Sequence, residues 1–205
     1  MRAIIWDMGG IIYDYFTESI LRRAESEGWD IRGIPIGPTS GVADPDFLAA
    51  DRGEIGEPEY GDRLQSRMRA AGIEIVIPDD VRDGFLIRPE TVEALADFKA
   101  AGYLQSVLTN DGTRWLGEGW WETWELRGYF DAIIDVLQVG VKKPAPEPYL
   151  ASVDALGLEP GECVFVDDLH INCEGAERVG IASVWFDITD PGGSLERVRR
   201  RLEAG

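Results

Sequence analysis

The stretch Arg2-Ala-Ile-Ile-Trp-Asp-Met-Gly-Gly10 opens with a short apolar run, Ala3–Trp6, that ends at an acidic residue. A run of this length, bounded by charged residues and glycine, is typical of a strand buried on both faces of a parallel sheet. Four further runs of the same kind follow along the chain: Leu104–Leu108, Ala132–Ile134, Cys163–Val166 and Ala182–Phe186. The sequence therefore predicts a parallel sheet built from these runs.

Helical patterns separate the later runs. In Thr91–Ala101 the apolar residues recur at helical spacing, and Gly102 follows as a stop signal. Three more helical segments are expected: Pro146–Ala155, Asn172–Val179 and Ser194–Leu202. Strands that alternate with helices predict an α/β fold with a doubly wound, Rossmann-like parallel sheet. Such sheets carry their chemistry at the carboxyl ends of the strands.

The segment between the first two predicted strands is far longer than one crossover helix requires. Its patterns are helical over Thr17–Glu27 and Glu57–Ala71. We interpret residues 13–88 as a small helical cap domain inserted after the first strand, which leaves an α/β core domain of residues 1–12 and 89–205. A cap that closes over a site would exclude water and supply substrate contacts. The alternative is a packing element without functional motion.

The charge balance of the chain limits its partners. Among 205 residues, 38 are acidic and 20 are basic, which gives a net charge of −18. Nucleic acids and anionic membranes would repel such a protein, so we expect neither as a partner. A small anionic substrate fits this charge if a local cation holds it.

Cysteine and histidine are scarce in this chain. Two cysteines cannot form a disulfide framework, and together with one histidine they cannot make a zinc site of the usual ligand types. A bound metal is therefore expected to be a hard cation on carboxylate oxygens. No apolar run reaches the length of a membrane span, and the N-terminus lacks the long apolar core of a signal peptide. We expect a soluble, cytoplasmic protein, and the sequence predicts no oligomeric state.

Polar side chains stand at or near the ends of four predicted strands. In chain order they are Asp7, the pair Thr109 and Asn110, Lys143, and the pair Asp167 and Asp168. A single acidic residue after a strand is usually a turn residue or a helix cap. The carboxyl ends of parallel strands, however, meet at one edge of the sheet. We therefore expect the whole set to converge on one site.

The side-chain types in this set suit phosphoryl transfer. Converging carboxylates repel one another and require a cation, and an all-oxygen ligand set suits Mg²⁺. Mg²⁺ and Lys143 would hold a phosphate dianion, which would let Asp7 attack phosphorus and form an aspartyl-phosphate. Thr109 and Asn110 would donate hydrogen bonds to the phosphoryl oxygens. The backbone can approach the substrate closely at two glycines, Gly9 and Gly10.

The ordered set resembles the haloacid dehalogenase-like superfamily, whose members are mostly phosphatases that form an aspartyl-phosphate. The resemblance covers nearly the whole chain, and its four motifs are Asp7-Met-Gly-Gly10, Leu108-Thr-Asn110, Gly140-Val-Lys-Lys-Pro144 with Tyr149, and Val166-Asp-Asp168 with Asn172, Gly175-Ala176 and Gly180. The helical insertion resembles the cap of the subclass that contains 2-haloacid dehalogenases and many small phosphatases.

The resemblance implies a role for each matched residue. Asp7 would be the nucleophile and, with the carbonyl of Gly9, a ligand of Mg²⁺. Asp168 would bind the same metal, and Asp167 would support it directly or through water. Lys143 would neutralise both Asp7 and the phosphoryl group. The phosphate of a small metabolite, such as a sugar phosphate, would lie against three further residues: Thr109, Asn110 and Gly10.

One position departs from the family's pattern. Most phosphatases of the family carry a second Asp two residues after the nucleophile, as general acid and base, and here that position is Gly9. The metal contact survives because it uses the backbone carbonyl, but the proton donor is lost. General acid–base help is typically worth about 10²–10⁴ in rate. We therefore expect a phosphatase that favours good leaving groups and dephosphorylates its aspartyl intermediate slowly.

Two other functions are compatible with these residues. A 2-haloacid dehalogenase would use Asp7 to attack carbon, and dehalogenases of the family also lack the second Asp. They usually carry an aromatic residue at the position of Gly9 and Ser-Asn-Gly in the second motif, where this chain has Thr-Asn-Asp. The change at Gly9 also leaves open a catalytically weak member that acts as a binding protein.

Overall fold

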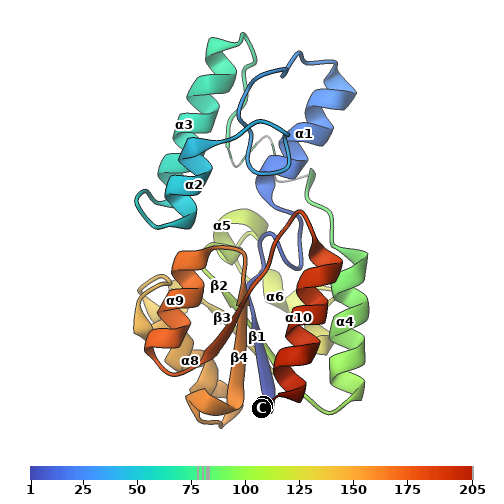
Figure 1. The fold of residues 1–205 in the computed structure, drawn as a ribbon, viewed down its shortest axis with the longest axis vertical. Helices are drawn as coiled ribbons and strands as arrows, with labels where there is room; N and C mark the ends of the chain where they lie inside the picture. The colour runs from blue at the N-terminus through green and yellow to red at the C-terminus, as the bar shows by residue number, and fades with distance from the viewer. Residues whose placement is uncertain (78, 80, 82–83, 205) are drawn as a thin grey trace. The chain divides into compact units, whose positions relative to one another are not determined.

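The computed structural model describes residues 1–77, 79, 81 and 84–204 (Figure 1). The chain divides into two compact units: the sheet unit comprises Met1–Tyr13 and Ile87–Gly205, and the helical unit comprises Asp14–Leu86. These boundaries lie within two residues of those expected from the sequence. Residues 78, 80, 82 and 83 of the expected cap domain, and residue 205 of the expected core domain, lie outside the described residues.

The sheet unit is built on five parallel strands. They are β1 (Ala3–Trp6), β2 (Leu104–Thr109), β3 (Ala132–Asp135), β4 (Cys163–Asp167) and β5 (Ala182–Trp185). They pair in the order β3-β2-β1-β4-β5, which confirms the predicted α/β fold with a parallel sheet and puts β1 at its centre. Strands β2, β3 and β4 continue to polar residues beyond the apolar runs, because the ladder pairs Thr109 with Asp135 and Asp167 with Trp185.

Helices cover both faces of this sheet, as Figure 1 shows. On one face α8 (Pro146–Leu156) and α9 (His170–Arg178) pack together against β2 to β5, and on the other α4 (Pro89–Ala100) packs beside α10 (Pro191–Glu203). All four helices were expected from the sequence. The short helices α5 (Gly112–Leu116), α6 (Trp120–Thr123) and α7 (Val136–Val139) were not, because four or five residues carry too little periodicity to be recognised.

Successive residues of β1 enter the two opposite layers of the core. Ala3 and Ile5 belong to the apolar cluster that includes Tyr149 of α8 and Phe165 of β4. Trp6 instead packs on the opposite side, where the centroid of its ring is 6.0 Å from that of Phe98 in α4. Its indole N–H donates a hydrogen bond to the buried side chain of Gln105 at 3.1 Å. The layers on both faces explain why β1 is apolar at every position.

The segment after β2 is anchored by a buried carboxylate. Asp135 at the end of β3 accepts hydrogen bonds from the backbone and hydroxyl of Thr113, both at 2.8 Å, and from the indole of Trp120 at 3.1 Å. Gly112 lies between these groups, where a Cβ atom would come within 2.7 Å of the Thr109 methyl group and 2.9 Å of the Trp120 ring. The packing therefore holds the β2 loop close to the sheet edge.

The helical unit contains α1 (Phe16–Glu27), α2 (Pro45–Asp51) and α3 (Glu57–Ala70). The sequence predicted α1 and α3 but not the seven-residue α2. Helix α2 begins with Asp44 as N-cap and Pro45 in its first turn, which are ordinary start signals for a helix. Within the described residues, none of the helices is both long enough and apolar enough to cross a bilayer.

Asp44 organises the helical unit. Its side chain is 1% exposed and accepts hydrogen bonds from the guanidinium of Arg67 at 2.9 and 3.2 Å, from the hydroxyl of Tyr60 at 2.9 Å and from the amide of Gly37 at 3.0 Å. It also caps two backbone N–H groups in the first turn of α2. Burial would raise the pKa of Asp44, but the bonds from Arg67, Gly37 and Tyr60 outweigh it and hold that pKa below its ordinary value.

We expect Asp44→Asn to destabilise the helical unit by about 3 kcal/mol, because Arg67 loses its buried anionic partner. The depressed pKa means that the wild-type carboxylate contributes fully above the ordinary Asp pKa of about 3.9, and that this contribution is lost as the pH falls through the folded-state pKa. The variant should lack this dependence. Hydrogen exchange of α2 and α3, corrected for the intrinsic effect of pH on exchange, measures both effects.

Asp46→Asn is the matched control for this prediction. Asp46 pairs with Arg63 at 2.7 Å on the surface of the same unit, with side chains 24% and 46% exposed, and its contact with Arg67 is longer, at 3.7 Å, than the one that Asp44 makes. An exposed pair of this kind contributes about 1 kcal/mol or less. Equal losses of protection in the Asp44 and Asp46 variants would show that Asp44 has no special structural role.

Candidate active site

The predicted site residues all belong to the sheet unit and stand at the carboxyl ends of neighbouring strands. Asp7 directly follows the central strand β1, Thr109 ends β2 on one side, and Asp167 ends β4 on the other. Lys143 lies in the segment between α7 and α8, which follows β3. One edge of the sheet therefore brings together residues that are as far apart in the chain as Asp7 and Asp167.

A buried lysine joins two of the carboxylates. The ammonium group of Lys143 donates hydrogen bonds to Asp7 Oδ1 at 2.6 Å and to Asp167 Oδ2 at 2.7 Å. Its side chain is 1% exposed, and its Nζ atom lies 5.2 Å from the centroid of the Phe165 ring. One cation held between two anions stabilises both, because water is excluded from the contact.

Burial acts in opposite directions on the pKa values of Asp7 and Lys143. Burial raises the pKa of Asp7, and the negative charge of Asp167 adds to the rise, so that the pKa reaches about 6 although Lys143 opposes the change. Burial alone would lower the pKa of Lys143, but Asp167 and Asp7 outweigh it and raise that pKa above the ordinary value. Lys143 therefore stays charged at neutral pH and can offset negative charge on a substrate.

Asp167 is held by more than the lysine. Its Oδ1 accepts from the amide of Leu169 at 2.9 Å, and the carboxamide of Asn172 in α9 donates to both of its oxygens at 3.0 and 3.1 Å. Both carboxylate oxygens are thus engaged with protein donors. This geometry favours Asp167 as the residue that orients Lys143, with any metal contact through water.

Asp168 lies close to Asp7 and Asp167. The carboxylate oxygens of Asp7, Asp167 and Asp168 include atoms that all lie within 4.8 Å of one another, and Asp168 is 5% exposed. A Cβ atom at Gly10, whose φ is +73°, would come within 2.6 Å of Asp168 Oδ2. Glycine is therefore required for the loop after β1 to approach this carboxylate. Three carboxylates at this spacing form a hard oxygen donor set that fits Mg²⁺.

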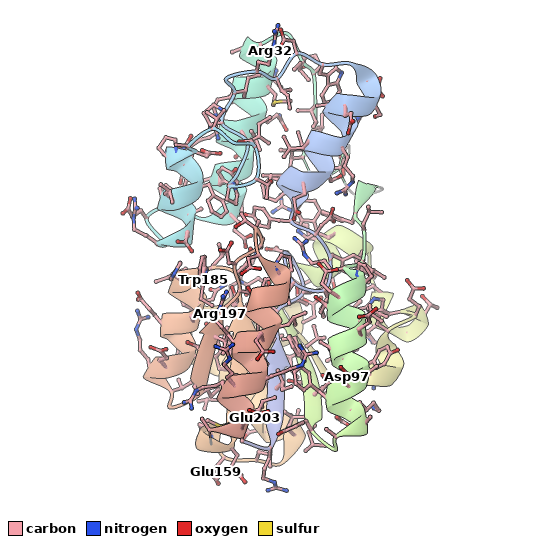
Figure 2. The ribbon with its side chains drawn as sticks, turned by 45° about the vertical axis from the view of Figure 1, so that its right-hand side comes forward. Arg32, Asp97, Glu159, Trp185, Arg197 and Glu203 are labelled. Atoms are coloured by element: carbon pink, nitrogen blue, oxygen red, sulfur yellow. The ribbon has the colours of Figure 1, made fainter. Side chains whose placement is uncertain are left out.

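Two further contacts hold the backbone around the carboxylate cluster. Arg88, which is 9% exposed, donates from Nε to the carbonyl of Gly10 at 2.9 Å. Trp185 at the end of β5, labelled in Figure 2, donates its indole N–H to the carbonyl of Asp168 at 2.8 Å. The roles of Arg88, Trp185 and Asn172 were not predicted from the sequence. Asn172 stood in a recognised motif, whereas nothing in the local sequence distinguished Arg88 or Trp185.

The two polar residues after β2 differ in their surroundings. Thr109 is 4% exposed, and its hydroxyl accepts from the amide of Asp111 at 3.4 Å. Asn110 turns its carboxamide to the backbone of Lys143, where Oδ1 accepts from the amide at 2.9 Å and Nδ2 donates to the carbonyl at 3.3 Å. The role expected for Asn110 as a phosphate donor therefore competes with a structural contact.

The fold and this arrangement of charges agree with one family. A family model described as haloacid dehalogenase-like hydrolase matches residues 1–180. The chain belongs to the haloacid dehalogenase-like hydrolases. The resemblance identified in the sequence is thereby confirmed.

Similar proteins include more than one activity. The phosphoglycolate phosphatase of Aquifex aeolicus is 35% identical over 92 residues, which cover 45% of this chain and 41% of that protein. A haloacid dehalogenase-like phosphatase from Thermococcus onnurineus shares the fold, with a TM-score of 0.60, 21% identity and 98% coverage of both chains. The L-2-haloacid dehalogenase of Xanthobacter autotrophicus also shares it, with a TM-score of 0.60, 19% identity, and 91% of this chain and 77% of that chain covered.

The curated relatives are longer than the segments that they share with this chain. The matched segments span between 17% and 41% of the length of these relatives. The activities of these relatives therefore support an activity for this haloacid dehalogenase-like hydrolase only where its own site residues fit that activity.

Proposed function

We propose that this haloacid dehalogenase-like hydrolase is an Mg²⁺-dependent phosphatase that acts on a small phosphorylated metabolite through an aspartyl-phosphate on Asp7. The observation that carries the proposal is the contact of Asp7 with Lys143 at 2.6 Å, beside a cluster in which carboxylate oxygens of Asp7, Asp167 and Asp168 lie within 4.8 Å of one another. A nucleophile, a fixed cation and an oxygen donor set are the groups that phosphoryl transfer requires. The similarity to a phosphoglycolate phosphatase supports the same chemistry.

The reaction proceeds in two displacements. A carboxylate oxygen of Asp7 attacks phosphorus, the bond from phosphorus to the leaving oxygen breaks, and the leaving group departs as an anion that takes a proton from water. Water then attacks the phosphorus of the aspartyl-phosphate and the bond to Asp7 breaks. The attacking water gives up a proton to the hydroxide left by the first step, and phosphate leaves with the carboxylate restored. Lys143 offsets the charge of the phosphoryl group in both steps, and Thr109 donates a hydrogen bond to it.

Asp7, Asp168 and the Gly9 carbonyl are the groups that we expect to hold Mg²⁺, with Asp167 behind them. When bound, Mg²⁺ would neutralise the phosphoryl oxygens and offset the repulsion between the carboxylates. Asp167 keeps Lys143 oriented toward Asp7 whether or not Mg²⁺ is bound. Its oxygens already accept hydrogen bonds from the side chains of Lys143 and Asn172 and from the backbone amide of Leu169.

The experiment that tests this proposal is a phosphate-release screen over phosphorylated metabolites with Mg²⁺, run with and without EDTA and beside Asp7→Asn. Aryl and sugar 1-phosphates should be the better substrates, with a burst of leaving group before the steady state, because no acid protonates the leaving oxygen. EDTA should abolish release. Activity that persists in EDTA, or that survives in Asp7→Asn, would contradict the proposal.

A substitution at Gly9 tests the leaving-group argument. Gly9 is exposed, and a Cβ atom there would have none of the described atoms within 4 Å, so that a larger side chain fits. We expect Gly9→Asp to raise turnover of alkyl phosphates about tenfold to a hundredfold, toward the lower end of typical general-acid effects, and to change aryl phosphate hydrolysis little. Gly9→Asn, which has the same shape and no acidic proton, is the control. An equal gain in both variants would exclude acid catalysis as its cause.

The dehalogenase alternative makes the opposite prediction about metal. Attack of Asp7 on carbon would displace halide with Lys143 as the cation and would need no divalent ion. Release of halide from 2-haloacids that EDTA leaves undiminished would decide for it. The cluster of three carboxylates around one lysine favours the phosphatase, because a reaction without a metal would leave an excess of negative charge beside an anionic substrate.

We also propose that the helical unit acts as the cap that the family resemblance implies and selects the leaving group. The support for this is its insertion directly after the loop that carries Asp7, Gly9 and Gly10. The substrate range of Asp44→Asn, compared with its turnover of an aryl phosphate, would separate selection from the chemical step.

A further inference from the structure

Asn110 makes a two-point contact with a single residue that lies 33 positions later in the chain. Its Oδ1 atom accepts a hydrogen bond from the amide of Lys143 at 2.9 Å, and its Nδ2 atom donates to the carbonyl of the same residue at 3.3 Å. A carboxamide that meets both backbone groups of one residue fixes the position and the direction of that peptide segment. The contact therefore links the end of β2 to the segment that carries the buried cation.

The side chain of Lys143 has little freedom to correct a displaced backbone. Its ammonium group must reach Asp7 at 2.6 Å and Asp167 at 2.7 Å at the same time, and Lys143 as a whole is 4% exposed. Asp167 is fixed in turn by Asn172 and by the Leu169 amide. A shift of the Lys143 backbone would therefore move the ammonium group away from one of its two partners.

We propose that Asn110 is a positioning residue that acts through Lys143, rather than a donor to the phosphoryl group. The proposal rests on the proposed function, since it concerns how Lys143 is placed against the nucleophile. Both polar atoms of the Asn110 carboxamide form hydrogen bonds with the Lys143 backbone. A donor to the substrate would instead keep its amide available for the phosphoryl group. Displacement of a catalytic group by about 1 Å can cost on the order of a hundredfold in rate.

The adjacent residues supply a matched control. Lys142 pairs with Asp111 at 2.6 Å, so the same two segments are joined a second time, one residue later than Asn110 in the first segment and one residue earlier than Lys143 in the second. The Lys142 side chain is 48% exposed, and an exposed pair contributes about 1 kcal/mol or less. Lys142→Ala removes a link between the two segments without touching the backbone of Lys143.

The kinetic test separates positioning from substrate binding. With p-nitrophenyl phosphate and Mg²⁺, Asn110→Ala should lower the single-turnover rate of leaving-group release at saturating substrate by tenfold to a hundredfold. Binding is measured in the Asp7→Asn background, where no turnover occurs, and adding Asn110→Ala there should change Kd less than threefold. Lys142→Ala should change neither quantity more than threefold. A rise in Kd that equals or exceeds the loss of rate would overturn the proposal.

A second measurement does not depend on activity. The Lys143 amide donates to Asn110, so its hydrogen exchange should accelerate at least tenfold in Asn110→Ala and remain near the wild-type rate in Lys142→Ala. Unchanged exchange in Asn110→Ala would overturn the proposed contact. If wild-type protein released no phosphate from any substrate, the proposed function would fail, and the exchange result would still report on the contact itself.

Discussion

Asp7→Asn should abolish phosphate release, by about four orders of magnitude or more, and leave the fold intact. A carboxamide has no anionic oxygen with which to attack phosphorus, and loss of a nucleophile removes the covalent route altogether. The Asn oxygen can still accept from Lys143, which is 2.6 Å from Asp7 Oδ1. Burial and the charge of Asp167 raise the pKa of Asp7, so removal of this charge should not lower stability in metal-free buffer.

Phosphate release in Mg²⁺ and thermal unfolding in metal-free buffer measure the two parts of this prediction. Trapping of a radiolabelled phosphoryl group by wild-type protein, and its absence from Asp7→Asn, would identify the covalent intermediate. If Asp7→Asn instead retained a tenth of the wild-type rate with a normal melting temperature, Asp7 could not be the nucleophile, and water would have to attack the substrate directly.

Lys143→Met should both inactivate the enzyme and destabilise the sheet unit by about 3–5 kcal/mol. Methionine keeps the length of the side chain but leaves the carboxylates of Asp7 and Asp167 without their shared cation, and removal of one partner from a buried ion pair typically costs this much. Asp167 is 0% exposed, so water cannot replace the ammonium group there. For a chain of this size we expect the melting temperature to fall by roughly 10 °C or more.

Lys142→Met is the control, because Lys142 precedes Lys143 in the chain and its side chain, which pairs with Asp111, is 48% exposed. We expect it to cost about 1 kcal/mol or less and to retain activity. Denaturant unfolding of both variants in metal-free buffer compares the two lysines directly. Equal stability of the Lys143 and Lys142 variants would mean that the buried contact does not hold the strand ends together.

The fold could be predicted from the sequence because its signals are local. Each strand of the sheet is rich in apolar residues, although β2 also carries Gln105 and Ser106, and the helices longer than eight residues show a regular apolar spacing or clear stop signals. The errors fall on short elements. Helix α2 has seven residues, and its start signal, Asp44 followed by Pro45, stood at the end of a glycine- and proline-rich stretch that favoured a loop.

The members of the site could also be predicted, because parallel strands bring their carboxyl ends to one edge regardless of the loops between them. Asp7, Lys143, Asp167 and Asp168 follow from that rule and from the motifs. The different roles of Asp167 and Asp168 could not be predicted. Two neighbouring aspartates look alike in sequence, but Asp167 is surrounded by donors.

The sequence by itself determined the parallel sheet, the insertion after its first strand and the set of charged residues at its edge, because apolar periodicity and strand order encode these features locally. Only the tertiary structure decided that Asn110 holds the backbone of Lys143 and that Asn172 holds Asp167. It also decided that Gly10 must lack a side chain beside Asp168. These contacts join segments whose approach depends on how helices and loops pack, and a short-range pattern carries no record of that packing.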